Sequence, residues 1–475
     1  MEWLQAPDYW LTRLVLERAL AAVYFIAFLV ALKQFRPLLG ENGLLPAPRF
    51  LRQVSFLQFP SLFHLRYSDR LLLAVAWSGA GLSLAMAAGL FELVPSWVSI
   101  LAWFALWALY LSIVNVGQIF YAFGWETLLL EAGFLAILLG SGGTVAPWPL
   151  VLLFRWLLFR VEFGAGLIKL RGDLCWRDLT CLYYHHETQP MPNPLSWYFH
   201  QLPKPVHRLE VLGNHFAQLV VPFFLFTPQP LASAAGGVIL LTQAWLVLSG
   251  NFSWLNILTM TLALSAFDDR SLGLLLRVQV PHQVALPPWW QAAVVVFAAA
   301  IVVLSYRPAR NLVSRHQLMN VSFDPFHLVN TYGAFGSVTK ERYEIVIEGS
   351  ADGATDWREY EFKGKPGDPR RRPRQFAPYH LRLDWLMWFA AMGSPRGHPW
   401  FLTLVVRLLQ GDRPTLRLLR RSPFPEGPTA IRARLYLYRF SKPGERRREP
   451  GWWVRTPVGD YLPVVRLDGD GGLRR

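Results

Sequence analysis

Apolar residues run in long blocks through the first 305 positions, and most blocks are separated by short polar links. A helix needs about 20 apolar residues to cross about 30 Å of hydrocarbon, so each block can be tested against that length. The blocks at 127–142 and 252–267 are short and suit tilted or re-entrant helices. We predict a polytopic α-helical membrane protein with about seven to nine spans. The candidate spans are 13–32, 71–91, 97–120, 127–142, 148–168, 209–227, 231–250, 252–267 and 288–305.

The fifth block, "PWPLVLLFRWLLFRVEFGAGLIKL", differs from the others because it contains Arg155, Arg160 and Glu162. A charged side chain at membrane depth is costly unless it faces protein or water and finds a partner. We therefore expect these three side chains to point into the protein.

Two polar segments, 33–70 and 169–208, are much longer than the other links. If all nine blocks cross the membrane, both segments and the C-terminal region lie on one side, and the N-terminus lies on the other. The sequence thus predicts a composite face built from two loops and the C-terminal region.

The residues after Tyr306 have the mixed polar and apolar pattern of a soluble domain. Strand-like runs flank Asp352-Gly353, a turn signal typical of a hairpin, and 431–440 alternates as a strand does. Between them, 381–392 and 399–412 suit amphipathic helices, which we expect to lie against the bilayer. We predict a membrane domain over 1–305 and a β-rich, β-sandwich-like domain over 306–475 with a helical insertion.

Composition and charge support this division. Hydrophobic residues make up 53% of the chain, which is too apolar for an ordinary soluble surface. The net charge is +15, and the part after residue 305 holds 30 Lys/Arg against 17 Asp/Glu. A basic domain tethered to a membrane suits anionic lipid head groups or an acidic partner better than nucleic acid. The run "GDPRRRPRQ" is either a solvated loop or a contact for such phosphates.

The two cysteines, Cys175 and Cys181, stand close together after the fifth block. They permit one disulfide or half of a metal site. The spacing C-x5-C differs from the C-x-x-C of redox sites. Adding His185 and His186 supplies the donor types that zinc uses, but adjacent histidines suit few geometries. We predict no metal here and expect hydrogen-bonded histidines at head-group level.

The segment after these histidines is rich in proline, with prolines at 190, 192, 194 and 203. Proline fixes φ and removes a backbone donor, so the segment is neither regular helix nor central strand. We expect a stiff connector. Trp197 and Tyr198 suit a membrane interface, where an aromatic body and a polar tip are both accommodated.

Lys169 lies at the end of the fifth block and allows two interpretations. A partly desolvated lysine can act as a base because burial disfavours its charged form. A lysine at a span end can instead extend its ammonium to the interface.

At these residues the chain resembles the lipase maturation factors of the endoplasmic reticulum membrane and their bacterial relatives. The stretches that carry the resemblance are "VEFGAGLIKLRGDLCWRDLTCLYYHHETQPMPNPLSWYFHQLP", "GENGLLPAPRFL", "GNFSWLNILTM", "EIVIEGSADG", "YEFKGKPGD" and "APYHLRLDWLMWFAA". The resemblance implies a chaperone-like factor with a protein client, without catalytic residues or a cofactor. The candidate client-binding residues are Arg171, Asp173, Trp176, Arg177, Asp178, His185, His186, Glu187, Asn193 and Trp197.

Charge and resemblance disagree about sidedness. The segments 33–70 and 169–208 together are rich in Lys and Arg, and the positive-inside rule would make their face cytoplasmic. The resemblance places that face in the lumen, and the rule is weaker for long loops and domains. We favour the extracytoplasmic side, in the endoplasmic reticulum membrane or a bacterial cytoplasmic membrane, and expect Cys175 and Cys181 to be bonded.

A shorter stretch, "AGLIKLRGDLCW", is similar to the membrane region of vitamin K-dependent glutamyl carboxylase and its relatives. That similarity implies an alternative function. The protein would be a membrane enzyme acting on a lipid- or quinone-associated substrate with Lys169 as the base.

Overall fold

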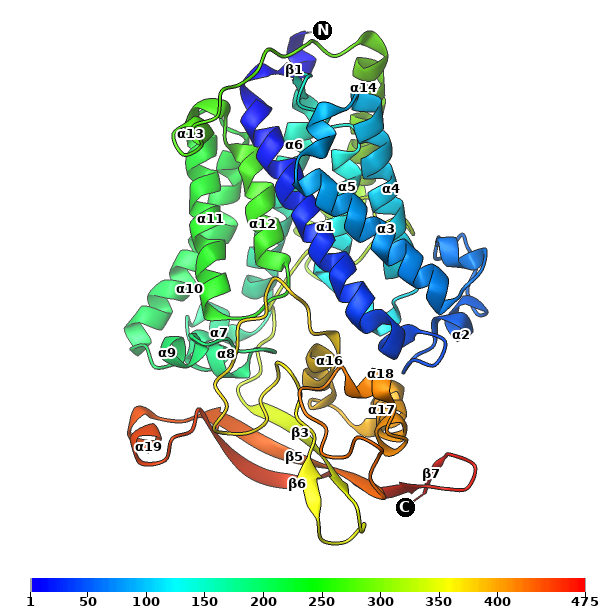
Figure 1. Cartoon of the computed structure of the whole chain (residues 1–475). Coiled ribbons are helices and arrows are strands. Elements are labelled where there is room, and N and C mark those ends of the chain that lie inside the picture. The colour runs from blue at the N-terminus through cyan, green and yellow to red at the C-terminus, as the bar shows by residue number, and fades with distance from the viewer. Residues whose placement is uncertain (1, 475) are drawn as a thin grey trace.

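The apolar blocks fold into a bundle of long helices, shown in the upper half of Figure 1. The structure is a computed structural model that describes residues 2–474. All nine predicted blocks are helical. The corresponding helices are α1 (Trp10–Leu39), α3 (Asp69–Ala87), α4 (Ser96–Asn115), α5 (Gly124–Ala136), α6 (Trp148–Arg171), α10 (Lys204–Leu219), α11 (Leu231–Ser249), α12 (Leu255–Ala263) and α14 (Pro288–Leu304).

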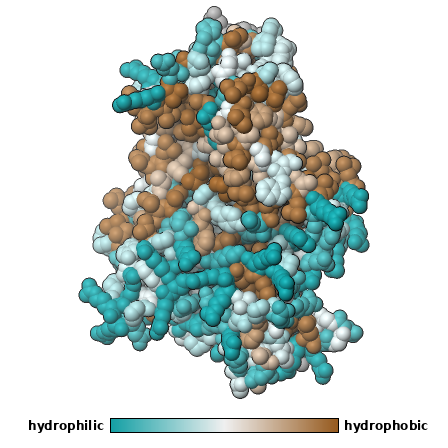
Figure 2. All heavy atoms as spheres, in the orientation of Figure 1, coloured by the Kyte–Doolittle hydropathy of each residue, from teal (hydrophilic) through white to brown (hydrophobic). Residues whose placement is uncertain are grey.

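Within residues 2–474, six helical segments are long and apolar enough to cross a membrane. They contain α1, α3, α4, α10, α11 and α14. The two short blocks became α5, with 13 residues, and α12, with 9 residues, which are shorter than a straight membrane-crossing helix. The chain through each block still runs from one end of the bundle to the other, because Trp254 contacts Trp125 at the lower end, whereas Gly142 and Phe267 contact Trp10 and Thr12 at the upper end. Helix α6 has 24 residues, so its length suffices, but its charges set it apart from the six. The protein is an integral membrane protein, and Figure 2 shows the apolar surface of this bundle above a polar lower part.

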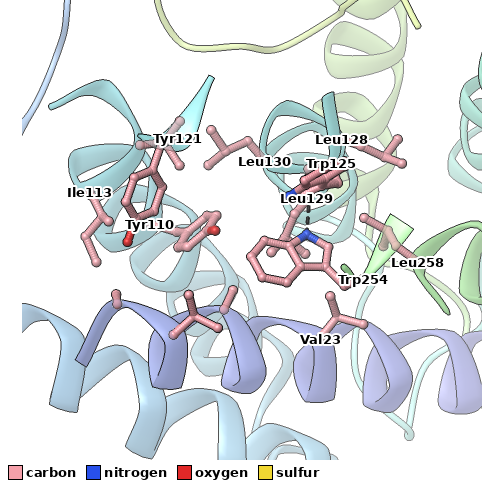
Figure 3. Packing of buried hydrophobic residues seen from close by; sticks show 14 of the residues in the cluster. Val23, Tyr110, Ile113, Tyr121, Trp125, Leu128, Leu129, Leu130, Trp254 and Leu258 are labelled. Atoms are coloured by element: carbon pink, nitrogen blue, oxygen red, sulfur yellow. Dashed lines mark hydrogen bonds between the residues drawn. The ribbon is translucent and has the colours of Figure 1, made fainter. Parts of the chain in front are cut away.

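The centre of the bundle is packed around α1 (Figure 3). The rings of Tyr24 and Phe28 meet Tyr110 edge to face at 5.6 and 5.4 Å between centroids. Gly79 of α3 lies against Phe28, where a Cβ atom would come within 2.3 Å of the ring. Small residues let membrane helices approach closely, because van der Waals contact drives their association. This position holds α1 and α3 together.

The C-terminal part contains one five-stranded antiparallel sheet in the order β4-β3-β5-β6-β7. The hairpin predicted at Asp352-Gly353 is present, since β3 pairs with β4 and Gly353 has a φ of 72°. The predicted strand 431–440 is also confirmed, as β5. The strands are β3 (Arg342–Ser350), β4 (Trp357–Glu359), β5 (Ala430–Phe440), β6 (Trp453–Leu467) and β7 (Leu473–Arg474).

The predicted helical insertion is confirmed as α16 (Arg382–Ala390), α17 (Pro399–Leu409) and the short α18 (Arg413–Leu416). These helices lie between the sheet and the bundle in Figure 1. The Tyr461 hydroxyl of β6 donates to the Ala390 carbonyl at 3.0 Å, and Arg382 reaches Glu126 of α5 at 2.7 Å. The expectation that the insertion faces the bilayer is therefore wrong, because its apolar side is covered by protein. Helices also take the place of the second sheet of a sandwich.

Shorter elements connect these parts. A two-residue strand at the N-terminus pairs with a two-residue strand that directly precedes α6, and short helices occupy the loops. They are β1 (Gln5–Ala6), β2 (Ala146–Pro147), α2 (Ala47–Leu51), α7 (Leu174–Arg177), α8 (Leu182–Thr188), α9 (Ser196–His200), α13 (Asp269–Gly273), α15 (Tyr306–Val313) and α19 (Pro443–Arg448).

Candidate functional site

The predicted signature segment 169–208 folds into α7, α8 and α9 at the lower end of the bundle (Figure 1). A disulfide joins Cys175 to Cys181 and closes the turn between α7 and α8, with 4.8 Å between the Cα atoms. Trp176 packs in the same small cluster and donates its indole N–H to the Phe335 carbonyl at 2.8 Å. The indole fixes the start of the segment against Phe335 of the C-terminal part, with Val211 of α10 in the same cluster.

The proline-rich part of the segment is bound on both sides by amide side chains. Asn193 donates to the carbonyls of Val247 and Leu248 at the end of α11. It also donates to Oε1 of Gln375 in the C-terminal domain, at 3.0 Å. Its own Oδ1 accepts from the backbone N–H of Ser196 at 2.9 Å. The stiff connector predicted from the prolines is therefore a buried joint.

Asn251 closes the same joint from the bundle side. Its Nδ2 donates to the Pro192 and Arg374 carbonyls at 3.2 and 2.8 Å. Its Oδ1 accepts from the backbone N–H groups of Phe376 and Ala377 at 2.7 and 2.9 Å. One side chain thus connects three stretches of chain, because an amide offers both donors and acceptors.

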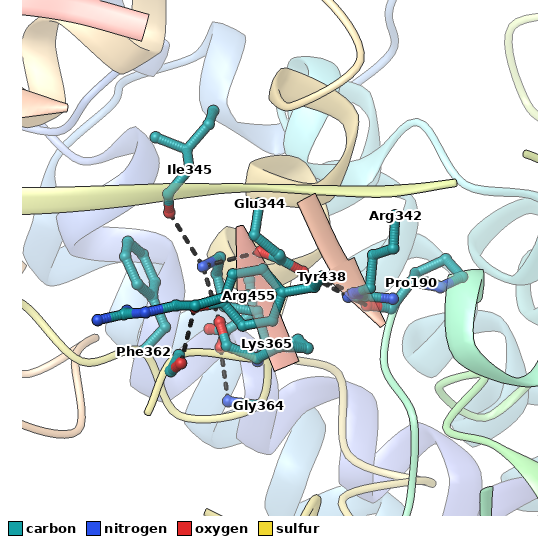
Figure 4. Close-up of polar contacts among 12 residues, drawn as sticks. Pro190, Arg342, Glu344, Ile345, Phe362, Gly364, Lys365, Tyr438 and Arg455 are labelled. Carbon is teal, nitrogen blue, oxygen red and sulfur yellow. Dashed lines mark hydrogen bonds and ion pairs between the residues drawn. The ribbon is translucent and has the colours of Figure 1, made fainter. Parts of the chain in front are cut away.

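A buried charge cluster lies beside Pro190, at the start of the proline-rich part (Figure 4). Arg342 of β3 donates to the carbonyls of Glu187, Gln189 and Pro190, so its guanidinium caps the turn into the proline-rich part. Glu344 faces both Arg342 at 2.6 Å and Lys365 at 2.9 Å, and all three side chains are almost fully buried. Buried charges persist only when paired and hydrogen-bonded, and this cluster meets both conditions.

Trp197 does not lie at the membrane interface, and that prediction is wrong. The residue is buried in an aromatic cluster with Tyr438, Phe440 and Trp453 of the C-terminal sheet. Its indole N–H donates to the Ser441 carbonyl at 2.8 Å. The sheet therefore offers the apolar contact and the acceptor that the interface was expected to supply.

The ten candidate client-binding residues divide by exposure. Trp176, His185, His186, Asn193 and Trp197 are buried. Arg171, Asp173 and Glu187 are half-buried, and Arg177 and Asp178 of α7 are exposed. The partly buried acids hold backbone: Asp173 accepts from the Val338 N–H, and Glu187 accepts from the Phe440 N–H. Most of the signature therefore connects the bundle to the C-terminal domain.

His185 and His186 are buried in the protein rather than placed at head-group level, the His186 ring makes no hydrogen bond within residues 2–474, and His200 is half-buried. Burial lowers the pKa of His185 and His200 to about 4 and lowers the pKa of His186 well below its usual value. The cost of charging a ring away from water is the main cause in each case. All three imidazoles are therefore neutral at physiological pH.

Lys169 ends α6 with its ammonium inside the protein. It donates to Asn214 Oδ1 at 3.0 Å and to Gln218 Oε1 at 2.6 Å, both on α10. The ammonium also lies 5.2 Å from the centre of the Trp176 ring. The lysine does not extend to the interface, and its partners join α6 to α10.

The charged side chains of the fifth block find partners inside the protein, as predicted. Arg155 donates to the carbonyls of Leu225 and Ser265. Arg160 pairs with Glu131, whose Oε2 also accepts from the Asn330 N–H and the Tyr332 hydroxyl.

Sequence reasoning missed the residues on the other side of these contacts. Glu126 of α5 forms an ion pair with Arg382 and lies 3.8 Å from His380, so it joins the bundle to the C-terminal domain. Glu126 and Glu131 are acids in or beside the apolar block 127–142, the same signal that singled out the fifth block. Asn251 gives no such signal, since only the fold shows what it contacts.

The other long polar segment behaves differently. Residues 46–66, which we call the arm, include α2 and protrude beside the lower end of α3 (Figure 1). Leu57 is 83% exposed and Leu65 is 88% exposed, and Phe56 is 54% exposed. The arm is held at its base, where the Ser61 hydroxyl donates to the Ser112 carbonyl of α4. It presents apolar side chains from a fixed base.

The fold and the site define a class of protein: a polytopic membrane protein whose extramembrane β-domain is docked on the bundle through a buried signature segment. Residues 11–274 match the lipase maturation factor transmembrane domain. Residues 328–463 match the lipase maturation factor C-terminal domain. The chain belongs to the lipase maturation factor family, as the resemblance predicted.

Relatives from vertebrates are similar over almost the whole chain. Lipase maturation factor 1 of Bos taurus is 45% identical, covering 97% of this chain and 90% of its own length. The Homo sapiens protein of that name is also 45% identical, covering 98% and 89%. Lipase maturation factor 2 of Rattus norvegicus is 32% identical, covering 95% and 82%. No solved structure matches the chain.

Proposed function

We propose that this protein is a membrane-embedded folding and assembly factor for secreted proteins, with clients of the lipase type. The observation that carries the proposal is the match of both domains to one family whose relatives are named lipase maturation factors. The buried joint supports it, because it fixes the C-terminal domain against the bundle and so gives a client one defined surface.

The client surface proposed here combines the arm, the exposed residues of the signature segment and the C-terminal domain. Exposed apolar groups at a fixed position suit a partly folded client, which has apolar surface of its own to cover. Arg177 and Asp178 are the exposed members of the ten candidates. The other eight act in this account by holding the domains in register.

We place this surface on the extracytoplasmic side, in the endoplasmic reticulum membrane or a bacterial cytoplasmic membrane. The disulfide between Cys175 and Cys181 supports this side, because such bonds persist in oxidising compartments. Labelling of an Asp178→Cys variant with a membrane-impermeant maleimide tests it, because that position is exposed whereas Cys175 and Cys181 are buried and bonded. Labelling of sealed vesicles of known orientation should occur from the lumenal side, and labelling from the cytoplasmic side alone would contradict the placement.

The function is tested by co-expression with a dimeric secreted lipase in cells that lack their own maturation factor. The chain should raise the secreted lipase activity, and the double variant Leu57→Ser/Leu65→Ser should lower that activity about fivefold, equivalent to roughly 1 kcal/mol. The amount of chain in the membrane is measured alongside.

Leu274→Ser/Leu275→Ser is the matched control. These leucines are 83% and 80% exposed and follow α13 at the opposite end of the bundle. The control should leave the secreted activity unchanged. Failure of the unaltered chain to raise lipase activity would contradict the function, whereas equal effects of the two double variants would contradict only the arm as the client surface.

A further inference from the structure

Three metal-ligating side chains meet between the signature segment and the bundle. His186 comes from α8, and His207 and Glu210 come from the first turns of α10. One ligand atom from each residue lies within 4.8 Å of the other two. Both histidines are almost completely buried, with 3% and 2% of their surface exposed.

His186 is the unusual member of this group. Among residues 2–474, neither of its ring nitrogens has a hydrogen-bond partner. Its ring lies between Phe199 at 5.5 Å and His207 at 5.6 Å, measured between ring centres. A buried imidazole without partners is costly, since both nitrogens lose their bonds to water. A bound ion would supply the missing partner.

Glu210 is already oriented toward the group. Its Oε2 lies 2.9 Å from Nδ1 of His207, one turn earlier on the same helix. Its Oε1 accepts from the Trp245 indole N–H of α11 at 3.0 Å. Such outer contacts fix a carboxylate in place, as they do around known metal centres.

We propose that His186, His207 and Glu210 bind one divalent transition-metal ion of the zinc type. Two imidazoles with a carboxylate are a donor set that suits zinc or cobalt and not calcium or magnesium, which prefer oxygen. Ligand bonds of about 2.1 Å place tetrahedral ligand atoms about 3.4 Å apart. A pair at the 4.8 Å limit would close by about 1.4 Å, and the His207 Nδ1–Glu210 Oε2 pair at 2.9 Å would open slightly.

The site differs from the arrangement that the sequence suggested. In the arrangement considered from the sequence, the candidate donors were the two cysteines and the adjacent histidines, but the cysteines are bonded to each other. Only His186 is shared, and its partners are 21 and 24 positions further along the chain. The ion ties α8 to α10 and so stabilises the signature segment, whether or not a client is bound.

The test measures metal in the purified full-length protein, prepared in detergent with an affinity tag that lacks histidine. Elemental analysis should find about one zinc ion per chain, and Co²⁺ added to chelator-treated protein should give the visible absorption of a tetrahedral site. Wild-type protein that neither contains zinc nor binds added Zn²⁺ or Co²⁺ would overturn the proposal.

Variants locate the ion. His186→Gln and Glu210→Gln should each lower the zinc content at least about tenfold. A chelator should lower the Tm of the unaltered protein and leave the Tm of these two variants unchanged. His282→Gln, which removes an exposed histidine from a loop, should keep both the zinc and the chelator effect. Unchanged zinc content in the two site variants would overturn the assignment. If those variants fail to fold, the wild-type metal content and cobalt spectrum decide the question.

Discussion

The two long polar segments of this membrane protein are similar in length and polarity but differ in structure. The proline-rich part of residues 169–208 is buried between the bundle and the C-terminal domain, where Asn193 and Trp197 donate to carbonyls of the two sides. The arm at residues 46–66 carries leucines that are more than four-fifths exposed. The polarity of a loop therefore does not show whether it is exposed, because polar side chains also satisfy the backbone of a buried joint.

The largest expected effect comes from the charge cluster beside the joint. Glu344→Gln leaves Arg342 and Lys365 buried without their counter-charge, and we expect a loss of about 3–5 kcal/mol in the free energy of unfolding. Arg36→Met in the other segment removes an exposed pair with Asp69 and should cost at most about 1 kcal/mol. Thermal unfolding in detergent measures both. Equal losses would remove the distinction between the two segments.

Asn251→Ala should rank next. It removes four hydrogen bonds to the Pro192, Arg374, Phe376 and Ala377 backbone, and leaving buried groups unpaired should cost about 2–4 kcal/mol. Gln53→Ala on the exposed arm is the control and should stay within about 0.5 kcal/mol of the unaltered protein. A destabilisation by Asn251→Ala no greater than that of the control would contradict the joint.

The docked domain should also respond to acid. Burial among aromatic rings lowers the pKa of His380 to about 4, below its usual value of 6.5. The unfolded chain then binds a proton that the folded chain does not, so stability is complete above about pH 6.5 and falls by roughly 1.4 kcal/mol per pH unit down to about pH 4.

His380→Gln removes the group whose protonation favours the unfolded chain, so it should flatten the dependence of Tm on pH between 7 and about 4.5. The comparison is the difference in slope between the variant and the unaltered protein, because other groups titrate in both. Parallel slopes would show that His380 is not buried in its neutral form.

The smallest expected effect on stability lies in the arm. Leu57→Ser/Leu65→Ser replaces exposed side chains and should change the free energy of unfolding by no more than about 0.5 kcal/mol per site. Limited proteolysis should still cut the unaltered protein in the arm before it cuts residues 185–200. A large loss of stability in the double variant would mean that the arm is packed.

Much of the fold could be predicted from the sequence because each element carries its own signal. Apolar length located all nine helices, and Asp352-Gly353 located the hairpin. Apolar length did not show that α5 and α12 would be shorter than their blocks. The strand β6 was missed because its alternation is interrupted by Pro457, Gly459 and Pro463.

The candidate site was predicted less completely, for a physical reason. The residue types in the signature segment are uncommon, which drew attention to it, but type does not show what a side chain contacts. Trp197 suits a membrane interface and a buried aromatic cluster equally well. Arg342, Asn251 and His207 lie far from the signature or at its end, and only the fold brings them to it.

Hydrogen exchange measured by mass spectrometry tests the central claim most directly, since it compares the two segments in one experiment on the intact protein. Amides of residues 189–200 should exchange slowly, at the rate of the C-terminal sheet, whereas amides of residues 52–59 should exchange rapidly. Rapid exchange in both segments would contradict the claim that the signature segment is a buried joint.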